Sequence, residues 1–469
     1  MTEYEVGPGG LAAVGRAVKS GDTVILRAGV YRERLTADTP GVTWQAAEPG
    51  TAVIDGAWQG DALPKEGLAQ VLVSAAGVTL DGLAVRNSPG RGIAVTANDA
   101  TIRGCVVDRT YGSGVTVNGG DRATITDCTI TRASSRFKAT RQQGGGGLVL
   151  VKTRGSMALV NTIAYCYGEG LDVDRSCVDG VISGNVIYDC GHVHLYIVRG
   201  RGNTLEDNLV FLTGNEEFKV GDGDNWPACF AIGDETGQKM HLYERSAANV
   251  VRRNILIGGG VLLHVRSNGN ADGYLTVLDA ATAIQNNTLI AGPNTRGGLW
   301  VDEATGHAHG AALIADNAIW PGGLPPSAAA RIRGEALRTR ANVIATDADM
   351  VNPGAGIRSE YPATGHNVDL GNYRPRALSR LVGVGTGGAT VGALPVVSGP
   401  PPTDPAGPDV AGALARLSTA RQQLEAIAAA GNAAAEAFAI IHEQLAVMAL
   451  AQADAADNVA AAQAALEAT

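Results

Sequence analysis

Five short segments of this sequence repeat one pattern of small and apolar residues around a central cysteine or asparagine. They read Thr101-Ile-Arg-Gly-Cys105-Val-Val107, Thr124-Ile-Thr-Asp-Cys128-Thr-Ile130, Val181-Ile-Ser-Gly-Asn185-Val-Ile187, Thr204-Leu-Glu-Asp-Asn208-Leu-Val210 and Val251-Arg-Arg-Asn254-Ile-Leu256. We assign the same central position to Leu83, Thr162, Asn287, Asn317 and Asn342. From Leu83 to Asn342 the steps are 22, 23, 34, 23, 23, 46, 33, 30 and 25 residues. The basic period is therefore 22 to 23 residues. We interpret the step of 46 as two periods and the other long steps as one period plus an inserted loop.

This period predicts a parallel β-solenoid. The segments alternate with period two, as strands do, and the repeat is shorter than a βαβ unit of about 30 residues. A leucine-rich repeat would need leucine to dominate, and it does not. A solenoid turn of three short strands fits this period. We call each turn a rung, and each rung would pair with the next at about 4.8 Å. Stacked asparagines are then expected to form an amide ladder at a corner. Cys105 and Cys128 are expected to be small buried fillers in the same column.

The composition agrees with a thin-cored repeat protein and excludes other classes. The chain has 469 residues, 63 glycines and only 4% aromatic residues. Its net charge of −9 argues against a nucleic-acid partner, which requires a basic face. The six cysteines form no CxxC pair, so we expect free thiols rather than a zinc cluster. The first residues do not read as a Sec signal peptide. The longest uncharged run, 381–403, is interrupted by glycine and proline, so we expect no membrane span.

Two regions resemble a known group of proteins. The stretch Gly21-Asp-Thr-Val-Ile-Leu-Arg-Ala-Gly-Val-Tyr-Arg-Glu-Arg34 and then Pro49-Gly-Thr-Ala-Val-Ile-Asp-Gly56 resemble the opening rungs of right-handed parallel β-helix proteins of the pectate-lyase-like superfamily. Gly168-Glu-Gly-Leu-Asp-Val-Asp174 is similar to their central rungs. The resemblance implies a right-handed parallel β-helix over residues 1–395. It does not imply one activity, because the superfamily contains lyases, hydrolases, epimerases, phage tailspikes and non-catalytic adhesins.

The carboxyl end has a different character. Residues 396–408 are proline-rich and are typical of a stiff linker. Residues 409–469 are alanine-rich, and their apolar positions alternate at steps of three and four, as in the seam of a coiled coil. We expect a helical assembly segment that associates with itself, most simply as a trimer, or packs on a partner helix or the solenoid's own flank. A break in phase near 431–432 leaves open whether it is one helix or a hairpin.

Five segments predict a flat outer face with a candidate catalytic site. Residues 92–96, 114–118, 147–151, 170–174 and 194–198 are expected to lie in register. Alternation then points two carboxylates of one strand outward, with a tyrosine on the next rung. One carboxylic acid would protonate a leaving oxygen, while the other activates water or attacks the sugar. The candidate catalytic residues are Asp172, Asp174, Tyr196, His194 and Arg199.

The pattern of polygalacturonase-like hydrolases is only partly present. Gly170-Leu-Asp172 resembles one part of it, but Gly191-His192-Val and Arg199-Gly-Arg201 are incomplete counterparts of the others. Lyase chemistry would need calcium against a uronate and a nearby base. Oxygen ligands for calcium are expected from Asp222, Asp224 and Asn225, with Lys219, Arg199 or Arg201 as base. A plain Gly-Asp turn explains the same loop equally well.

Aromatic residues in the inserted loops, together with His192 and Arg175 beside the predicted face, are candidate sugar contacts. Amphipathic rings stack on sugars but also pack the roots of loops. The candidate ligand-binding residues are Trp226, Tyr243, Trp300, His192 and Arg175. His264 joins His192 and His194 as a candidate acid–base group.

Three functions are compatible with the sequence. The first is a polysaccharide-recognising spike or adhesin component of a larger assembly, such as a phage tail. The missing Sec signal, the helical end and the incomplete catalytic patterns favour it, with a location in a virion tail or the cytoplasm. The second is a polysaccharide hydrolase or lyase that acts in a groove around Asp172, Asp174 and Tyr196. The third is a purely structural solenoid.

Overall fold

The computed structural model describes residues 1–60, 68–136, 145–219, 226–235, 245–267, 275–304, 306–355, 368 and 370–396. The chain divides into two units, one of residues 1–373 with 380–394 and the other of residues 374–379 with 395–469. The first unit holds all the named strands. The expected linker, after its first residue, and the expected coiled coil over 409–469 lie outside the described residues, so both stay predictions.

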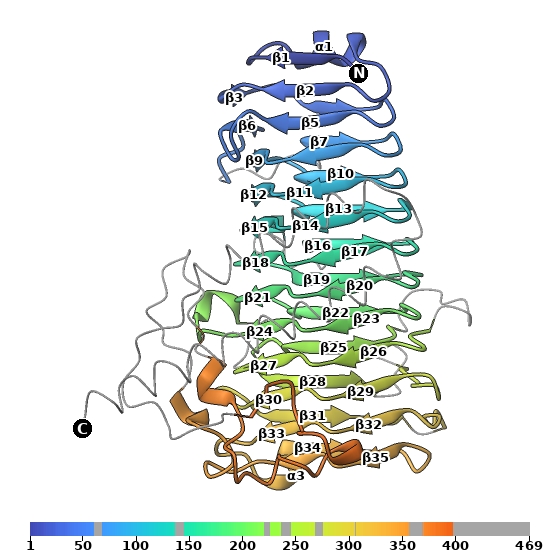
Figure 1. The fold of residues 1–469 in the computed structure, drawn as a ribbon, viewed down its shortest axis with the longest axis vertical. Coiled ribbons are helices and arrows are strands. Elements are labelled where there is room, and N and C mark those ends of the chain that lie inside the picture. The colour runs from blue at the N-terminus through green and yellow to red at the C-terminus, as the bar shows by residue number, and fades with distance from the viewer. Residues whose placement is uncertain are drawn as a thin grey trace, which may run out of the picture. The chain divides into compact units, whose positions relative to one another are not determined.

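Three parallel sheets form the first unit, and most rungs give one strand to each sheet in turn. Sheet I contains β1 (Glu3–Val6), β2 (Thr23–Leu26), β5 (Thr43–Ala46), β8 (Thr79–Asp81), β11 (Thr101–Arg103), β14 (Thr124–Thr126), β17 (Met157–Leu159), β20 (Val181–Ser183), β23 (Thr204–Glu206), β26 (Val250–Arg252), β29 (Ala283–Gln285), β32 (Leu313–Ala315) and β35 (Arg338–Arg340). Sheet II contains β3 (Gly29–Tyr31), β6 (Ala52–Asp55), β9 (Ala84–Ser88), β12 (Val106–Thr110), β15 (Thr129–Thr131), β18 (Thr162–Ala164), β21 (Val186–Tyr188), β24 (Leu209–Phe211), β27 (Ile255–Ile257), β30 (Thr288–Ile290), β33 (Ala318–Trp320) and β36 (Val343–Ile344). Sheet III contains β4 (Leu35–Ala37), β7 (Val71–Val73), β10 (Ile93–Val95), β13 (Val115–Asn118), β16 (Gly146–Val151), β19 (Glu169–Asp174), β22 (Leu195–Val198), β25 (Phe230–Gly233), β28 (Val261–Arg266), β31 (Gly297–Val301) and β34 (Ala330–Ile332). Figure 1 shows these strands stacked as rungs, with β1 at one end and β35 at the other. The predicted three-strand parallel solenoid is confirmed.

Short helices close and connect the rungs. α1 (Leu11–Ala17) lies at the β1 end, where its spacing of three residues buries Leu11 and Val14 together in the core (Figure 1). α3 (Pro326–Ala329) precedes β34 and starts with a proline, whose missing N–H costs nothing at a helix start. The 3-10 helices are η1 (Glu216–Phe218), η2 (Pro353–Ala355), η3 (Leu370–Tyr373) and η4 (Thr386–Gly388).

The expected asparagine ladder runs along the corner between sheets I and II. Each side-chain amide donates to the side-chain oxygen of the next member, as Asn185 Nδ2 does to Asn208 Oδ1 at 2.9 Å. Most members also donate to a backbone carbonyl of a neighbouring rung, as Asn208 does to Ile182 O at 3.0 Å. The ladder consists of Asn161, Asn185, Asn208, Asn254, Asn287, Asn317 and Asn342. Cys105 and Cys128 occupy the column before it and are fully buried, as predicted.

The backbone explains which residues precede the ladder. The residue before each column position has a positive φ, between 47° and 67°, which turns the chain from one sheet into the next. Glycine, asparagine and aspartate tolerate this left-handed conformation best. The residues in this position are Gly82, Gly104, Asp127, Val160, Gly184, Asp207, Arg253, Asn286, Asp316 and Ala341.

Two details of the predicted repeat are wrong. The ladder member in its rung is Asn161 and not Thr162, which begins the strand β18. The step of 46 residues is one enlarged rung and not two. Asn208 bonds Asn254 directly, and Leu209 pairs with Ile255 in sheet II. The additional residues lie in insertions on either side of β25, which leave the pairing of the sheets unbroken.

The core is one rung wide and mostly aliphatic. Gly92, Gly114, Gly147 and Gly170 form a column where the chain enters sheet III. A β-carbon at each of them would lie within 3 Å of a carbonyl oxygen in the next rung. Rungs this close leave little room for large rings, which explains the low aromatic content.

The outer faces of sheets II and III differ. The side chains of Tyr188, Phe211 and Ile257 on sheet II pack against Met350, Tyr373 and other residues that follow the last strand. This part of the face of sheet II is therefore covered by the chain itself. Sheet III carries a row of polar and aromatic side chains on its outer face, and the candidate site lies there.

All six cysteines are buried and free, in agreement with the expectation from their spacing. Within the described ranges, no helix has both the length and the apolar character that crossing a membrane requires.

Candidate functional site on sheet III

The predicted register of the outer face is correct. Leu148 pairs with Leu171, and Leu171 pairs with Leu195, so the inward residues of β16, β19 and β22 align. The outward residues between them form one row that continues along the sheet. This row contains Val149, Asp172, Tyr196, Ala231, His264, Trp300 and Arg331. Residues far apart in the sequence thus become neighbours at the strand spacing of about 4.8 Å.

Four acidic side chains gather at the β19 end of this row. We call Glu169, Asp172, Asp174 and Glu235 the carboxyl cluster. Burial raises the pKa of Asp172 well above its usual value, and the negative charges of the other three members raise it further. Its Oδ1 is shielded from solvent and has no hydrogen-bond partner among the described residues. A buried polar atom without a partner is unusual in a folded protein and marks a position where a ligand atom can bind.

Arginines surround the second carboxylate of the strand. Arg175 Nε lies 3.0 Å from Asp174 Oδ2, and a guanidinium nitrogen of the buried Arg199 lies 3.7 Å from Asp174 Oδ1. Burial raises the pKa of Asp174, while these two arginines counteract that rise. For Asp172, the influence of Arg175 is weaker than burial and the three neighbouring carboxylates. As pH rises, Asp174 therefore ionises before Asp172. Both arginines have a positive φ, at the turn that leaves sheet III.

Tyr196 and His192 flank the carboxyl cluster. The Tyr196 hydroxyl donates to Glu235 Oε1 at 3.2 Å, and the guanidinium of Arg266 lies 5.6 Å from the centre of the tyrosine ring. His192 Nδ1 lies 2.9 Å from Glu169 Oε1. The structure thus brings Tyr196, His192 and Arg175 to the face where the sequence predicted them.

His194 does not reach this face. It is fully buried, where it follows Gly92, Gly114, Gly147 and Gly170 in the column that enters sheet III. Its Nε2 accepts from the Cys190 N–H at 3.2 Å, so its Nδ1 carries the proton and donates to Ala228 O at 3.0 Å. Burial lowers the pKa of His194 to about 4. Its expected catalytic role is wrong for this reason, because its neutral ring bonds to the backbone inside the corner of a rung and is not exposed on the outer face.

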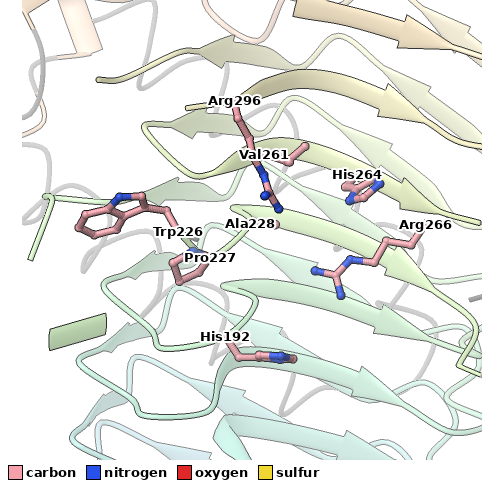
Figure 2. Close-up of a pocket in the computed structure, with 8 residues that line it drawn as sticks. All are labelled: His192, Trp226, Pro227, Ala228, Val261, His264, Arg266 and Arg296. Atoms are coloured by element: carbon pink, nitrogen blue, oxygen red, sulfur yellow. The ribbon is translucent and has the colours of Figure 1, made fainter. Parts of the chain in front are cut away.

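A pocket opens farther along the same face. It encloses about 170 Å³ and is lined by His192, Trp226, Pro227, Ala228, Val261, His264, Arg266 and Arg296. Figure 2 shows the side chains of Arg266 and Arg296 directed toward its middle from two sides, with Ala228 between them. None of these lining residues carries a carboxylate. We call it the cationic pocket.

Charged groups and one aromatic ring organise the rim of the cationic pocket. Asp302 accepts from His264 Nε2 and from Arg331, both at 2.8 Å. The Arg331 guanidinium lies 3.7 Å from the centre of the Trp300 ring, and Trp300 Nε1 donates to Ala328 O at 2.7 Å. Burial lowers the pKa of His264, so its ring is held mainly neutral. The sequence predicts Trp300 in a loop, but it lies in β31, and its ring packs between Arg331 and His264.

The remaining expected contacts are less favourable or lie outside the described residues. Trp226 is almost fully buried, and the Lys219 ammonium lies 5.2 Å from its ring centre, so it packs the root of its loop. Tyr243 and the expected calcium ligands Asp222, Asp224 and Asn225 lie outside the described residues. Among the residues that the structure does describe, no group of three acidic, histidine or cysteine side chains is arranged to hold a metal ion.

Comparisons with known proteins agree with this architecture. Residues 69–289 match the family described as "Right handed beta helix region". Residues 69–289 therefore have the fold of a right-handed parallel β-helix. The expected resemblance to the pectate-lyase-like superfamily is thereby confirmed at the level of the fold. No curated protein sequence matches this β-helix chain.

Several solved structures share the fold at low sequence identity. The pectate lyase Pel9A is 14% identical with a TM-score of 0.53, over 84% of this β-helix chain and 96% of its own. A variant of the PL6 family alginate lyase AlyGC is 16% identical with a TM-score of 0.50, over 87% of this chain and 60% of its own. The Dettilon tailspike protein is 13% identical with a TM-score of 0.48, over 70% of this chain and 65% of its own.

Several residues of this face of the β-helix are not predicted by the sequence patterns. Glu169 stands in the central motif of residues 168–174, but it precedes the strand that alternation predicts. Glu235, Arg296 and Asp302 lie beside insertions, whose variable lengths hide the register. Arg331 can be found by continuing the row from Tyr196 in steps of one strand. Arg266 lies in the neighbouring outward row, where it pairs with Gly233.

Proposed function

We propose that this protein binds a polysaccharide along the outer face of sheet III and hydrolyses a glycosidic bond at the carboxyl cluster. One observation supports this most. Asp172 presents a solvent-shielded carboxyl oxygen without a partner, two residues from the arginine-paired Asp174 on the same strand. Two carboxyl groups whose surroundings separate their pKa values are the usual basis for assigning an acid and a base.

Asp172 is the proposed acid. Burial and the neighbouring carboxylates raise its pKa, so it keeps its proton to a higher pH than an ordinary aspartate does. It would give this proton to the glycosidic oxygen as the bond from that oxygen to the anomeric carbon breaks. The leaving sugar then departs as an alcohol, and Asp172 becomes the anion.

Asp174 is the proposed base or nucleophile. Arg175 and Arg199 favour its ionised form. It would take a proton from water as the water oxygen attacks the anomeric carbon, or attack that carbon itself and form an ester that water then cleaves. The backbones of the two residues lie about 7 Å apart, as for any two residues at this spacing in a strand. Both stereochemical outcomes are compatible with this spacing, and the anomer of the first product distinguishes them.

The shape of the site suits an extended ligand. The polar row runs across successive rungs instead of closing around one point, and the partly exposed Trp300 offers an apolar surface on which a sugar can lie. A pectate lyase and an alginate lyase are among the solved structures with this fold, which also favours a polysaccharide.

Recognition without cleavage is the second candidate. Its support is the spacing of three and four residues between apolar positions of 409–469, which favours a self-associating or partner-binding segment. In this case the protein would be a spike or adhesin component of a larger assembly, such as a virion tail. Sedimentation of the full chain and of a chain ending at Pro395 tests assembly. A full chain of higher mass, with a monomeric shorter chain, supports the segment's role, whereas two monomers contradict it.

Cleavage is tested with a panel of acidic and neutral polysaccharides. New reducing ends indicate hydrolysis, and the absorbance of an unsaturated uronate would indicate a lyase instead. Asp172→Asn is expected to lower the hydrolysis rate about a hundredfold or more while binding persists. Asp38→Asn is the matched control, because Asp38 is exposed just after β4, near the N-terminal end of the same sheet. Undiminished hydrolysis by Asp172→Asn would contradict the proposal. Binding without any cleavage by the unaltered chain would favour the recognition role.

A further inference from the structure

The cationic pocket adjoins the carboxyl cluster at His192, which contacts Glu169, and extends from there along the rod to His264 and Arg266. Asp172 lies in β19, whereas His264 and Arg266 lie in β28, and the sheet order from β19 to β28 contains β22 and β25 between them. At about 4.8 Å for each strand, this places the far side of the pocket, at His264, about 14 Å from Asp172. An extended sugar chain that reaches from one region to the other must have several units.

The pocket has the character of a site for an anionic group. Five of its lining side chains carry nitrogen donors, and two of these are arginines, which stay charged at any physiological pH. The carboxylates closest to its histidines, Glu169 and Asp302, accept from His192 and His264 at 2.9 and 2.8 Å. The wall between the arginines consists of small apolar residues, Ala228 and Val261, against which one face of a sugar ring can pack.

We propose that the cationic pocket binds a carboxylate- or sulfate-bearing sugar several units away from the bond that Asp172 cleaves. The inference rests on the proposed function, and it adds the class of substrate and the position of its charge. Arg296 and Arg266 would donate to the anionic oxygens, because a guanidinium matches carboxylate and sulfate groups with two parallel hydrogen bonds. The substrate is then an acidic polysaccharide, and short acidic fragments bind poorly because they cannot reach both regions.

The test measures binding of defined oligosaccharides to the full chain carrying Asp172→Asn, which prevents turnover. The probes are hexasaccharides of galacturonate, of mannuronate and of sulfated galactose. Each is paired with an uncharged counterpart, the methyl ester for the first two and unsulfated galactose for the third. We expect at least one charged hexasaccharide to bind about tenfold or more tightly than its counterpart, since a hydrogen-bonded charge contributes about that much. The carboxylate and sulfate arms identify which anion the pocket prefers.

Variants locate the effect. Arg296 is exposed, so Arg296→Gln is expected to fold normally and to remove most of the preference for the charged probe. Arg340→Gln is the matched control, because Arg340 is an exposed arginine on sheet I, and it should keep the preference. The disaccharide of the preferred charged sugar should bind at least tenfold more weakly than the hexasaccharide.

Three results would overturn this inference. They are equal binding of every charged probe and its counterpart, binding of no probe, and a preference that Arg296→Gln leaves intact. Failure here is separable from failure of the proposed function. If neutral polysaccharides are cleaved and Asp172→Asn abolishes that cleavage, the catalytic roles stand and only the charge requirement is wrong.

Discussion

Replacing Asn208 with alanine removes one member from the middle of the asparagine ladder. The side chain makes four hydrogen bonds, all buried. Its Nδ2 donates to Ile182 O at 3.0 Å and to Asn254 Oδ1 at 2.9 Å, and its Oδ1 accepts from the backbone N and from the side-chain Nδ2 of Asn185 at 3.0 and 2.9 Å. Alanine replaces none of them, and water cannot enter a corner that is 1% exposed.

The expected loss follows from this count. At about 1 kcal/mol for each net hydrogen bond, the four bonds correspond to about 4 kcal/mol. The backbone N–H of Asn185 and the carbonyl of Ile182 are also left without these partners inside the protein. The loss should be local, because in a stacked repeat each rung contacts only its neighbours.

Hydrogen exchange is the suitable assay, because a rod of repeats does not unfold as a single two-state unit. The free energy of opening should fall by about 4 kcal/mol at the amides of β20, β21, β23 and β24 and stay unchanged at the β1 end. Asn342→Ala is the matched control. Asn342 ends the ladder and is only half-buried, so water can replace its bonds and the loss should be about half as large. A loss below about 1 kcal/mol at Asn208, or equal losses for both variants, would refute the argument that buried amide stacking holds the corner.

Three further predictions concern pH and backbone packing. The folded-state pKa of His194, about 4, lies below the unfolded value of about 6.5. Above about pH 6.5 the histidine is neutral in both states and leaves the free energy of unfolding unchanged. As pH falls to about 4, the unfolded state is protonated first, so about 3 kcal/mol of this free energy is lost. Urea midpoints should show this slope in the native chain and a flatter one in His194→Gln; identical slopes would contradict it. Gly168→Ala should cost about 3 kcal/mol, because the added carbon would overlap the carbonyl of Gly145, whereas Gly15→Ala in α1 meets no atom within 4 Å and should stabilise by up to about 1 kcal/mol. Equal urea midpoints for these two variants would contradict this prediction, because they would show that neighbouring rungs can move apart to accommodate the added carbon. Hydrolysis should fall at high pH as Asp172 loses its proton and at low pH as Asp174 gains one, so a rate that keeps rising with pH would exclude Asp172 as the acid.

The fold could be predicted because the residues that form the corner between sheets I and II repeat from rung to rung. The left-handed residue before each ladder position is glycine, aspartate or asparagine in most rungs, so the corner is visible in the sequence. Val160 breaks this composition rule, since a β-branched residue holds the same positive φ before Asn161. For that reason the sequence pattern places this ladder position one residue too late, at Thr162.

The site could be predicted only where the rungs have the basic length. Asp172, Asp174 and Tyr196 lie in consecutive short rungs, so alternation gives both their register and their direction. The prediction for His194 is wrong because alternation alone points it outward, whereas the glycines of its column show that side chains there face the interior. Glu235 and Arg296 follow insertions of irregular length, and no periodicity determines where such residues return to the sheet.

The enlarged rung between Asn208 and Asn254 has an evolutionary consequence. Strand pairing on both sides of these insertions is unbroken, so the number of inserted residues can change without shifting any strand against its neighbour. During evolution, each insertion could therefore change in length or sequence independently of the others. Ligand specificity could change with it, while the β-helix keeps folding as before.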